Sequence, residues 1–281
     1  MKNFKIISLG LGQQSTTLYY MSSLGEIPRA DYAIFSDPGA ESKVTYAYLK
    51  GLLKWQKKNK GIPIIVTGRK SIYTDLILGL NAEGNRFASI PAFTKDENGK
   101  IGMLRRQCTD DYKIKEVNNA IRKLYGLKKY ARTPHTEIWI GISVDEIQRL
   151  KQPRYKWQTF VYPLCNYTTT KEATTLVNYT ARLNRNDCQH WLTVHHLPIP
   201  PKSSCIFCPY QSNRSWLDMK KNRSEEWDDA VQLDTKIRNS SQKGVHHPIY
   251  LHRSCTPLSE VDLQENQLDL FECECEGFCG I

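Results

Sequence analysis

The sequence predicts an α/β protein with a doubly wound, mostly parallel sheet. Short apolar runs that read as strands alternate with longer stretches in which apolar residues recur every three or four positions, the pattern of amphipathic helices. A glycine-rich turn directly follows the first apolar run, as is typical where a strand passes into a helix in such sheets. Strands and helices that alternate in this way pack as a parallel sheet with helices on both faces.

The expected strands cover residues 4–7, 30–36, 61–67 and 137–140, and the expected helices between them cover 44–55 and 114–124. Thr169 and Glu172 form a capping-box pair ahead of Ala173, Leu176 and Val177, which predicts another helix there. A further helical stretch is predicted at 216–237. Residues 82–106 have only weak periodicity, so we expect a loop-like flap or insertion.

The prolines of the segment at 197–201 predict a boundary, because proline interrupts both helices and strands. We expect a nucleotide-binding α/β domain at 1–197 and a cysteine-rich extension at 198–281 that carries metal or cluster ligands and a thiol tail. Of the 281 residues, 40% are hydrophobic, yet no apolar run is long enough to span a membrane. The first residues lead into a strand rather than a signal-peptide segment, so we expect a cytoplasmic protein without membrane contact.

Charge is distributed unevenly along the chain. The chain has 39 basic and 29 acidic side chains, but residues 259–281 contain seven acids and no Lys or Arg. The remainder therefore has 39 basic against 22 acidic side chains, a surplus of 17. Such a surplus attracts nucleic acid or a multiply phosphorylated small molecule, while the alternative is a solvated basic surface.

The glycine-rich turn has the composition of a phosphate-binding loop. Its glycines allow a tight turn and close approach to an anion, and the first amides of the next helix point at the bound charge. The candidate phosphate-binding residues are Ser8, Gly10, Gly12, Gln14, Ser15 and Thr16. The alternative is an ordinary connection between a strand and a helix.

Two other loops are expected beside this turn, because ligands of open α/β sheets bind where loops leave the carboxyl ends of the strands. The loop after the second strand contributes Asp37, Gly39 and Glu41, and the loop after the fourth contributes Gly141 and Asp145. For Asp37 and Asp145 the alternative role is to cap the following helix.

The chain has nine cysteines and no export signal, so they are more easily explained as ligands, nucleophiles or plain thiols than as disulfides. Cys108 is flanked by Arg105, Arg106 and Lys113, whose charges would lower a thiol pKa and bind phosphate or sulfate oxygens. Cys205 and Cys208 form a Cys-x-x-Cys pair, a spacing that suits both zinc and iron–sulfur sites.

Together these loops resemble the phosphoadenosine phosphosulfate reductase-like branch of the PP-loop, or adenine nucleotide alpha hydrolase, superfamily. Its first loop usually reads Ser-Gly-Gly-x-Asp-Ser-Thr, and Gln14 stands where the acid is normal, as in the reductases. The segment at 37–41 is similar to that family's Asp-Thr-Gly element, and the segment at 141–146 to Gly-x-Arg-x-x-Glu, with Ser143 in place of the arginine. The resemblance implies a HUP-type fold that binds ATP or an adenylyl (phospho)sulfate, either with or without a bound Mg²⁺ ion.

The resemblance also implies a 4Fe-4S iron–sulfur cluster. Adenylylsulfate reductases of this branch bind one through a Cys-Cys pair before a similar helix and a later Cys-x-x-Cys. Here the matching ligands are Cys108, Cys205 and Cys208, with Cys188 as the candidate for the fourth. Zinc bound by the same four, or with His195 replacing one, is the alternative, and unconnected buried thiols are a third reading.

The tail is similar in kind to the C-terminal Glu-Cys-Gly motif of the reductases, whose cysteine attacks sulfur. Cys275 and Cys279 are the candidate nucleophiles, with Arg105, Arg106 and Lys113 stabilising the charge that develops on the leaving oxygens. The alternative is an acidic terminus with incidental thiols.

Three functions are compatible with these features. The first is reduction of an adenylyl (phospho)sulfate with a thioredoxin-like reductant. The second is ATP-dependent sulfur transfer to tRNA or DNA, which the basic surplus favours. The third is a non-catalytic nucleotide or nucleic-acid sensor with a structural metal site. The loop similarity places the reductase first.

Overall fold

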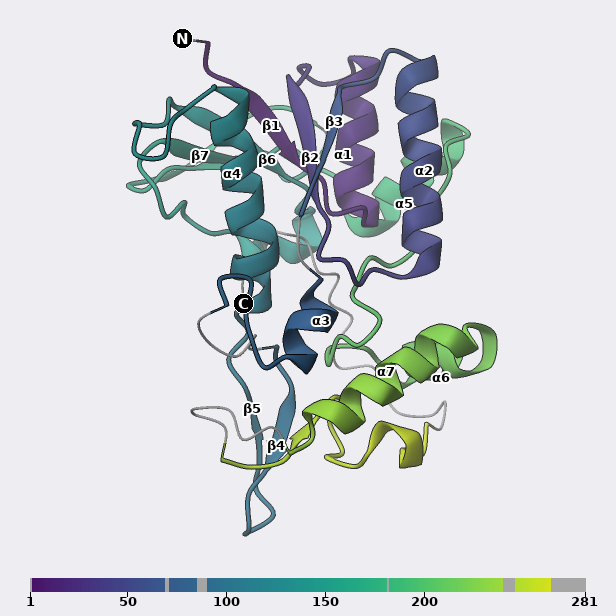
Figure 1. The fold of residues 1–281 in the computed structure, drawn as a ribbon. Coiled ribbons are helices and arrows are strands. Elements are labelled where there is room, and N and C mark those ends of the chain that lie inside the picture. Colours follow the sequence, from purple (N-terminus) through teal and green to yellow (C-terminus); the bar gives the residue numbers. More distant parts are fainter. Residues whose placement is uncertain (1, 69–70, 85–89, 181, 240–245, 264–281) are drawn as a thin grey trace.

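The fold is taken from a computed structural model, which describes residues 2–68, 71–84, 90–180, 182–239 and 246–263. Its main feature is a seven-stranded sheet in the order β3-β2-β1-β6-β7-β8-β9 (Figure 1). Strands β3 to β7 in that order run parallel, and β8 and β9 add antiparallel pairs at one edge. The expected mostly parallel α/β sheet is therefore confirmed. The strands are β1 (Lys5–Ser8), β2 (Tyr32–Ser36), β3 (Ile64–Thr67), β6 (Thr136–Ile140), β7 (Gln158–Tyr162), β8 (Tyr167–Thr169) and β9 (Thr174–Leu176).

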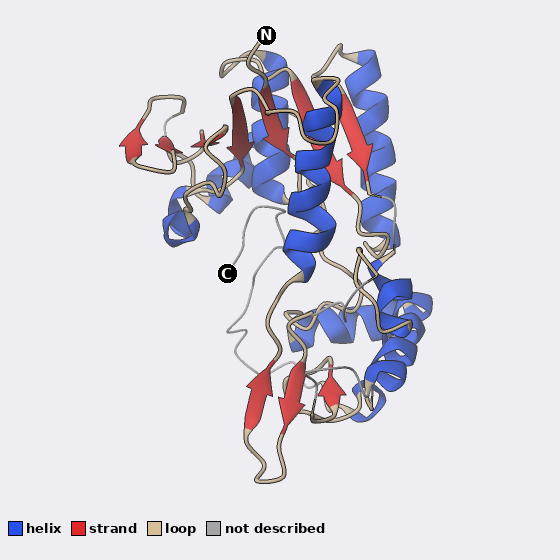
Figure 2. Ribbon diagram, turned by 60° about the vertical axis from the view of Figure 1, so that its left-hand side comes forward, coloured by secondary structure: helices blue, strands red, loops and turns tan. Residues whose placement is uncertain are grey.

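Helices cover both faces of this sheet (Figure 2). Consecutive strand residues point to opposite faces, so Ile7 and Trp139 pack in one core cluster while Ile6 and Ile138 pack in another. The first cluster is closed by α1 (Gln13–Leu24), α2 (Lys43–Lys58) and α5 (Arg185–Val194), and the second by α4 (Lys115–Leu124). This arrangement is compatible with a doubly wound sheet.

The order of the strands reverses between β1 and β6. From β1 the chain steps through α1 and α2 to β2 and β3 on one side, and it then crosses by α4 to β6 on the other side of β1. Such a reversal leaves a crevice at the carboxyl ends of the two strands, where α/β sheets bind ligands. The loops after β1 and β6 lie at this position.

A second layer lies beyond the edge at which β1, β2 and β3 end (Figures 1 and 2). It combines a three-stranded sheet of order β10-β4-β5 with short helices around one core cluster. That cluster joins Ile72 and Tyr112 to Trp216, so residues from both sides of the expected boundary share one core. The elements are α3 (Ile72–Ile77), β4 (Phe93–Lys95), β5 (Ile101–Met103), α6 (Asn213–Asn222), α7 (Ser224–Ile237), β10 (Ile249–Tyr250) and the 3₁₀ turn η3 (Leu258–Glu260).

The prediction of a helix after Thr169 is wrong. Thr169 ends β8, and β9 begins at Thr174, so this segment is a hairpin rather than a helix. The hydroxyl that binds backbone here belongs to Thr170, whose Oγ1 accepts hydrogen bonds from the N–H groups of Glu172 (3.3 Å) and Ala173 (3.1 Å). It closes a turn, and β-branched residues on either side favour strands.

Two other expectations need refinement. The weakly periodic segment contains the hairpin of β4 and β5, whose turn is closed by Asp96 Oδ1 accepting from the N–H groups of Asn98 (3.0 Å) and Lys100 (2.8 Å). The helical stretch at 216–237 is two helices, α6 and α7, separated at Arg223. Cys165 is fully buried, and burial raises its pKa to about 11.

Candidate functional site

The loop between β1 and α1 is a tight, buried turn. Leu11 adopts a left-handed conformation (φ 58°), and Ser15 Oγ bonds both the N–H of Gly10 and the carbonyl of Gly12, each at 3.2 Å. The Thr16 N–H donates to the Gly12 carbonyl at 3.0 Å and begins the helix. Gly12 is the N-cap and provides no side chain to cap the first turn. Amides that no side chain caps are the donors that an anion requires at this position.

Gly141, at the end of β6, allows the strand to approach this turn. A Cβ atom at Gly141 would lie 2.5 Å from the backbone nitrogen of Ser15 and 2.6 Å from its Cα. Real Cβ atoms do not approach backbone so closely, so the contact between the two loops depends on glycine. The loops after β1 and β6 therefore meet, as the sequence predicts.

Gln14 connects the two loops through its side chain. Its Nε2 donates to Glu146 Oε2 at 3.0 Å and to Ser143 Oγ at 3.4 Å, and the residue is almost fully buried. Its Oε1 has no hydrogen-bond partner among the described residues. Glu146 is also ion-paired to Arg149 within the 3₁₀ helix η2 (Val144–Arg149). A carboxylate thus lies beside the loop, although position 14 has none.

Two arginines that no sequence motif identifies lie near the loop. Arg149 reaches the loop through Glu146, and the Nε of Arg185 donates to Gln13 Oε1 at 3.2 Å. Arg185 begins α5, where Asn184 and Asp187 form a reciprocal capping box. That capping box is the sequence signal that could have located the helix and, with it, the arginine.

Asp37 organises the loop after β2 rather than capping the next helix. Its Oδ1 accepts hydrogen bonds from the N–H of Gly39 and from the hydroxyl of Tyr46, both at 2.7 Å. The N-cap of α2 is Ser42, whose hydroxyl accepts from the Thr45 N–H. Asp145 lies in η2 and accepts a hydrogen bond from the Arg185 N–H at 3.4 Å.

Glu41 joins this loop to the cysteine-bearing segments. Its side chain is fully buried and forms an ion pair with Lys113 at 3.3 Å, while Ser203 Oγ donates to its other oxygen at 3.2 Å. The backbone of Glu41 forms an antiparallel bridge with Cys205, and the Ile206 N–H donates to the Ala40 carbonyl at 2.9 Å. The Cys-x-x-Cys segment is therefore hydrogen-bonded to the end of the β2 loop.

Three of the four predicted metal ligands line one small cavity, namely Cys108, Cys205 and Cys208. Arg106 and Lys113 line it too, whereas Arg105 is exposed and is not among its lining residues. Tyr112 connects this cavity to the sheet, since its carbonyl accepts a hydrogen bond from Ser36 Oγ (2.7 Å) at the end of β2. The cysteine cavity therefore lies at the same edge of the sheet as the loop at 8–16.

Cys188 is not part of this cavity. It lies on α5 in the core cluster with α1, and its carbonyl accepts a hydrogen bond from Thr17 Oγ1 at 3.4 Å. His195, the alternative ligand, stacks on Trp191 and forms an ion pair with Glu26. Within the described ranges no three His, Cys, Asp or Glu side chains are arranged around a single metal ion. Cys275 and Cys279 lie outside the described residues.

The chain matches no protein-family model, no curated protein and no solved structure. In the part of the chain that the structure describes, no helix has the length and apolar character required to cross a membrane.

Proposed function

We propose that this chain is an adenine-nucleotide-dependent, sulfur-handling enzyme of the PP-loop type that resembles phosphoadenosine phosphosulfate reductase. The observation that carries the proposal is the pairing of Glu41 with Cys205. It joins a nucleotide-type loop to a cysteine pair more than 160 positions away, at the edge of the sheet where ligands bind.

The proposed nucleotide site uses backbone more than side chains. The amides of the first turn of α1 would bind the phosphates, and Arg185 would add a positive charge through its position beside Gln13. Gln14 is neutral, so the turn itself contributes no carboxylate that would repel an anion. Glu146 is paired with Arg149, which offsets its charge.

The donor set of the cysteine cavity fits an iron–sulfur cluster held by three protein thiolates. Cys188 and His195, the residues considered as a fourth ligand of a cluster or of zinc, are not among the residues that line the cavity. Cys108, Cys205 and Cys208 would hold the cluster, which when bound supplies electron transfer or an electrophilic iron. Arg106 would favour thiolates and an anionic substrate in the same place, whereas the charge of Lys113 is offset by its ion pair with Glu41.

The proposed reaction is attack by a C-terminal thiolate, Cys275 or Cys279, on the sulfur of an adenylyl (phospho)sulfate. A sulfur–sulfur bond forms, the sulfur–oxygen bond to the nucleotide breaks, and the nucleotide leaves with its electron pair on a phosphate oxygen. The enzyme then carries a thiosulfonate on cysteine. A thioredoxin-like dithiol releases sulfite from it and is itself oxidised to a disulfide.

The test is sulfite release from adenylyl sulfate and phosphoadenylyl sulfate, with reduced thioredoxin and anaerobically purified protein. Cys275→Ser and Cys279→Ser are compared in parallel, and one of them is expected to abolish release while the other retains it. Sulfite release that both variants retain would contradict the thiol mechanism. Nucleotide binding without any turnover would favour the sensor.

The segment at 147–171 favours a second candidate, ATP-dependent sulfur transfer to tRNA or DNA. It contains no acid, and its exposed part presents Lys151, Arg154 and Lys156 around Tyr155, which stacks on Trp157 with ring centroids 5.9 Å apart. Basic side chains interleaved with aromatic rings suit a nucleic-acid strand. Pyrophosphate release from ATP that requires added tRNA or DNA would support this candidate and displace the reductase.

A further inference from the structure

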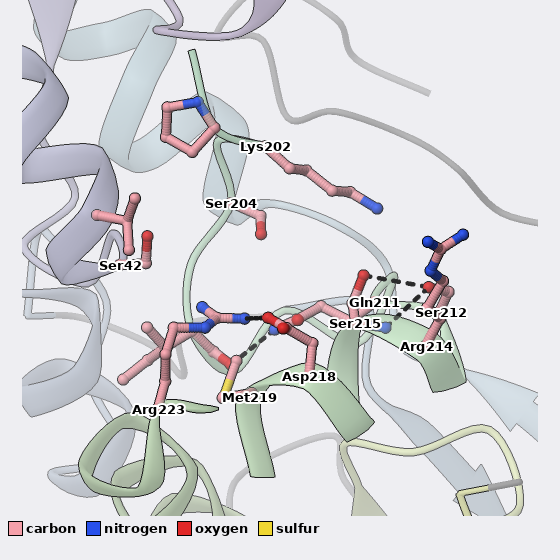
Figure 3. Close-up of a pocket in the computed structure, with 13 residues that line it drawn as sticks. Ser42, Lys202, Ser204, Gln211, Ser212, Arg214, Ser215, Asp218, Met219 and Arg223 are labelled. Carbon is pink, nitrogen blue, oxygen red and sulfur yellow. Dashed lines mark hydrogen bonds and ion pairs between the residues drawn. The ribbon is translucent and has the colours of Figure 1, made fainter. Parts of the chain in front are cut away.

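A cavity of about 420 Å³ lies between the start of α2, the segment at 201–206 and helix α6 (Figure 3). Pockets of roughly 300–1,000 Å³ are the ones that hold small ligands, and this one suits a group of nucleotide size. None of the residues of the loop at 8–16 lines it, and none of the three cysteines of the neighbouring cavity does. It is therefore separate from the site described above.

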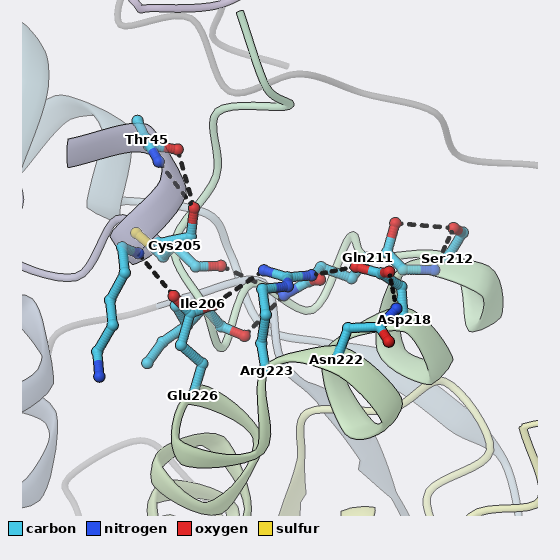
Figure 4. Close-up of polar contacts among 12 residues, drawn as sticks. Thr45, Cys205, Ile206, Gln211, Ser212, Asp218, Asn222, Arg223 and Glu226 are labelled. Carbon is cyan, nitrogen blue, oxygen red and sulfur yellow. Dashed lines mark hydrogen bonds and ion pairs between the residues drawn. The ribbon is translucent and has the colours of Figure 1, made fainter. Parts of the chain in front are cut away.

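The lining of this cavity is cationic. Lys202 extends from the segment at 201–206 and Arg214 from α6, and neither forms an ion pair among the described residues. Arg223 is the third cation, but it is bonded to Asp218 and Glu226 (Figure 4). Among the described residues Asp218 is the only carboxylate in the lining, and its hydrogen bonds from Asn222 and Arg223 hold its pKa below the usual value. Two positive charges thus remain uncompensated.

The backbone around the cavity also favours a negatively charged ligand. Ser42 and Ser212, the N-caps of α2 and α6, both line it, and neither helix has an acidic residue in its first turn. The Lys43 N–H of α2 already donates to Glu226 Oε1 at 2.6 Å, so it is the positive end of the α6 dipole that adds to the charges of Lys202 and Arg214. Hydroxyl groups of Ser204 and Ser215 supply neutral donors on the same walls.

The wall nearest the sheet is the cysteine-bearing segment itself. Ile206 lines this cavity, while Cys205 lines the cysteine cavity. Gln211 fixes the segment by donating from Nε2 to the carbonyl oxygens of Ile206 (2.7 Å) and Cys205 (3.3 Å), as Figure 4 shows. A ligand in the cationic cavity would thus lie next to the segment that carries Cys205.

We propose that this cavity is a second anion site, which binds a phosphate-bearing ligand of nucleotide size through Lys202 and Arg214. Its occupant is either a free mononucleotide or one phosphodiester of a nucleic acid, because both present the same charged oxygens. The proposal does not rest on the loop at 8–16, so it stands or fails independently of the reductase assignment.

Uridine probes test the proposal without engaging a site that selects adenine. Binding of 5′-UMP and of a short fluorescent oligouridylate to the full chain is measured by titration at low salt. The double variant K202A/R214A is compared with K100A/R132A, which removes the same charges from exposed positions outside the cavity. We expect K202A/R214A to bind about tenfold or more weakly and K100A/R132A to bind like the wild type.

Ser212→Asp adds a variant that keeps the helix cap, because aspartate is as good an N-cap as serine. It places a carboxylate in the cavity, so it should weaken binding as much as the double variant while leaving the melting temperature nearly unchanged. Displacement of the oligouridylate by UMP identifies a mononucleotide site, and binding of the oligouridylate alone identifies a phosphodiester site. If neither UMP nor the oligouridylate binds, or if K202A/R214A and K100A/R132A bind with equal affinity, the proposal is overturned.

Discussion

The two halves of the candidate site are built in different ways. The loop at 8–16 is held by hydrogen bonds among neighbours, such as Ser15 with Gly10 and Gly12. The cysteine cavity draws Cys108 from the segment before α4 and Cys205 and Cys208 from a segment almost a hundred residues later. Buried polar contacts centred on Glu41 join the segments of the cysteine cavity to the loop after β2.

This difference shows which properties of a site a sequence can reveal. A local turn is encoded by consecutive residues, so its glycines and hydroxyls are visible as a motif. A cavity assembled from distant segments has no local signature, and its weakest points are the long-range contacts that close it. The two halves should therefore respond differently to substitution, and variants can measure that difference.

The largest expected effect is on the iron content that the proposed cluster would give the protein. Cys108→Ala and Cys205→Ala should each remove most of the iron and acid-labile sulfide, because each deletes one ligand of a shared cluster. Cys188→Ala is the matched control and should keep both, since Cys188 packs in the core between α1 and α5. Metal and sulfide are measured after anaerobic purification. Loss of iron from Cys188→Ala, or its retention in Cys108→Ala, would show that the ligand set is different.

The buried ion pair between Glu41 and Lys113 should contribute much more to the free energy of unfolding than an exposed ion pair does. Lys113→Met would leave the fully buried Glu41 carboxylate without its cation, which costs about 3–5 kcal/mol of the free energy of unfolding. Lys43→Met removes the cation of a solvent-exposed pair with Glu225 and should cost far less stability, because water screens that pair. Denaturant titration of the two variants gives the comparison. Equal destabilisation would mean that the Glu41–Lys113 pair does not hold the two halves together.

The same contrast explains what could be predicted from the sequence. The parallel strands follow from short apolar runs and the helices α2 and α4 from a period of about 3.6 residues, and both patterns depend only on neighbouring residues. The hairpin after Thr169 was missed because a capping-box pattern also fits a turn closed by Thr170. Cys188 was grouped with the other cysteines by residue type, yet helix α5 places it in the core beside α1. Nothing local to Cys188 distinguishes a ligand from a core thiol.

A pH dependence should separate the second layer from the main sheet. His252 is buried, and burial and Arg253 lower its pKa to about 4. The folded chain therefore keeps it neutral while the unfolded chain binds a proton below about pH 6.5, so stability falls as the pH drops from about 6.5 towards 4. The loss attributable to this group is about 2–3 kcal/mol over that range.

His252→Asn should flatten the pH dependence of unfolding between about pH 6.5 and 4.5. His190→Gln, at an exposed position on α5, is the control and should follow the wild-type curve. Because His252 bonds Asn213 at the start of α6, the protection factors of the amides in α6 and α7 should fall at low pH before those of β1 and β6. Simultaneous loss of protection in both layers would mean that they unfold as one unit.

Gly141→Ala tests the half of the site that is formed by the loop at 8–16. Its Cβ would clash with the backbone of Ser15, so β6 and the first turn of α1 would have to separate, at a cost of about 1–3 kcal/mol. Gly51→Ala is the matched control, because nothing lies within 4 Å of a Cβ atom there and alanine in the middle of α2 should stabilise it by about 0.5–1 kcal/mol. Nucleotide affinity should fall in the first variant only. An unchanged affinity would argue that the phosphates bind elsewhere.

The smallest effect is expected at Gln14, where a single charge is changed. Gln14→Glu would place a second carboxylate about 3 Å from Glu146 and beside the proposed phosphate site, so we expect about tenfold weaker binding of an adenine nucleotide without Mg²⁺. Gln13→Glu introduces the same charge one residue earlier, where the Arg185 guanidinium can pair with it, and should change the affinity by about twofold or less.

The double variant Q14E/E146Q separates repulsion from loss of the amide. It returns the local charge to the wild-type value, so the affinity should recover if repulsion is the cause. Failure to recover would mean that the Gln14 amide itself contacts the nucleotide, which its buried and unpartnered Oε1 would allow. In that case the loop would use a side chain as well as its backbone, and the contrast between a backbone-built half and a side-chain-built half of the site would narrow.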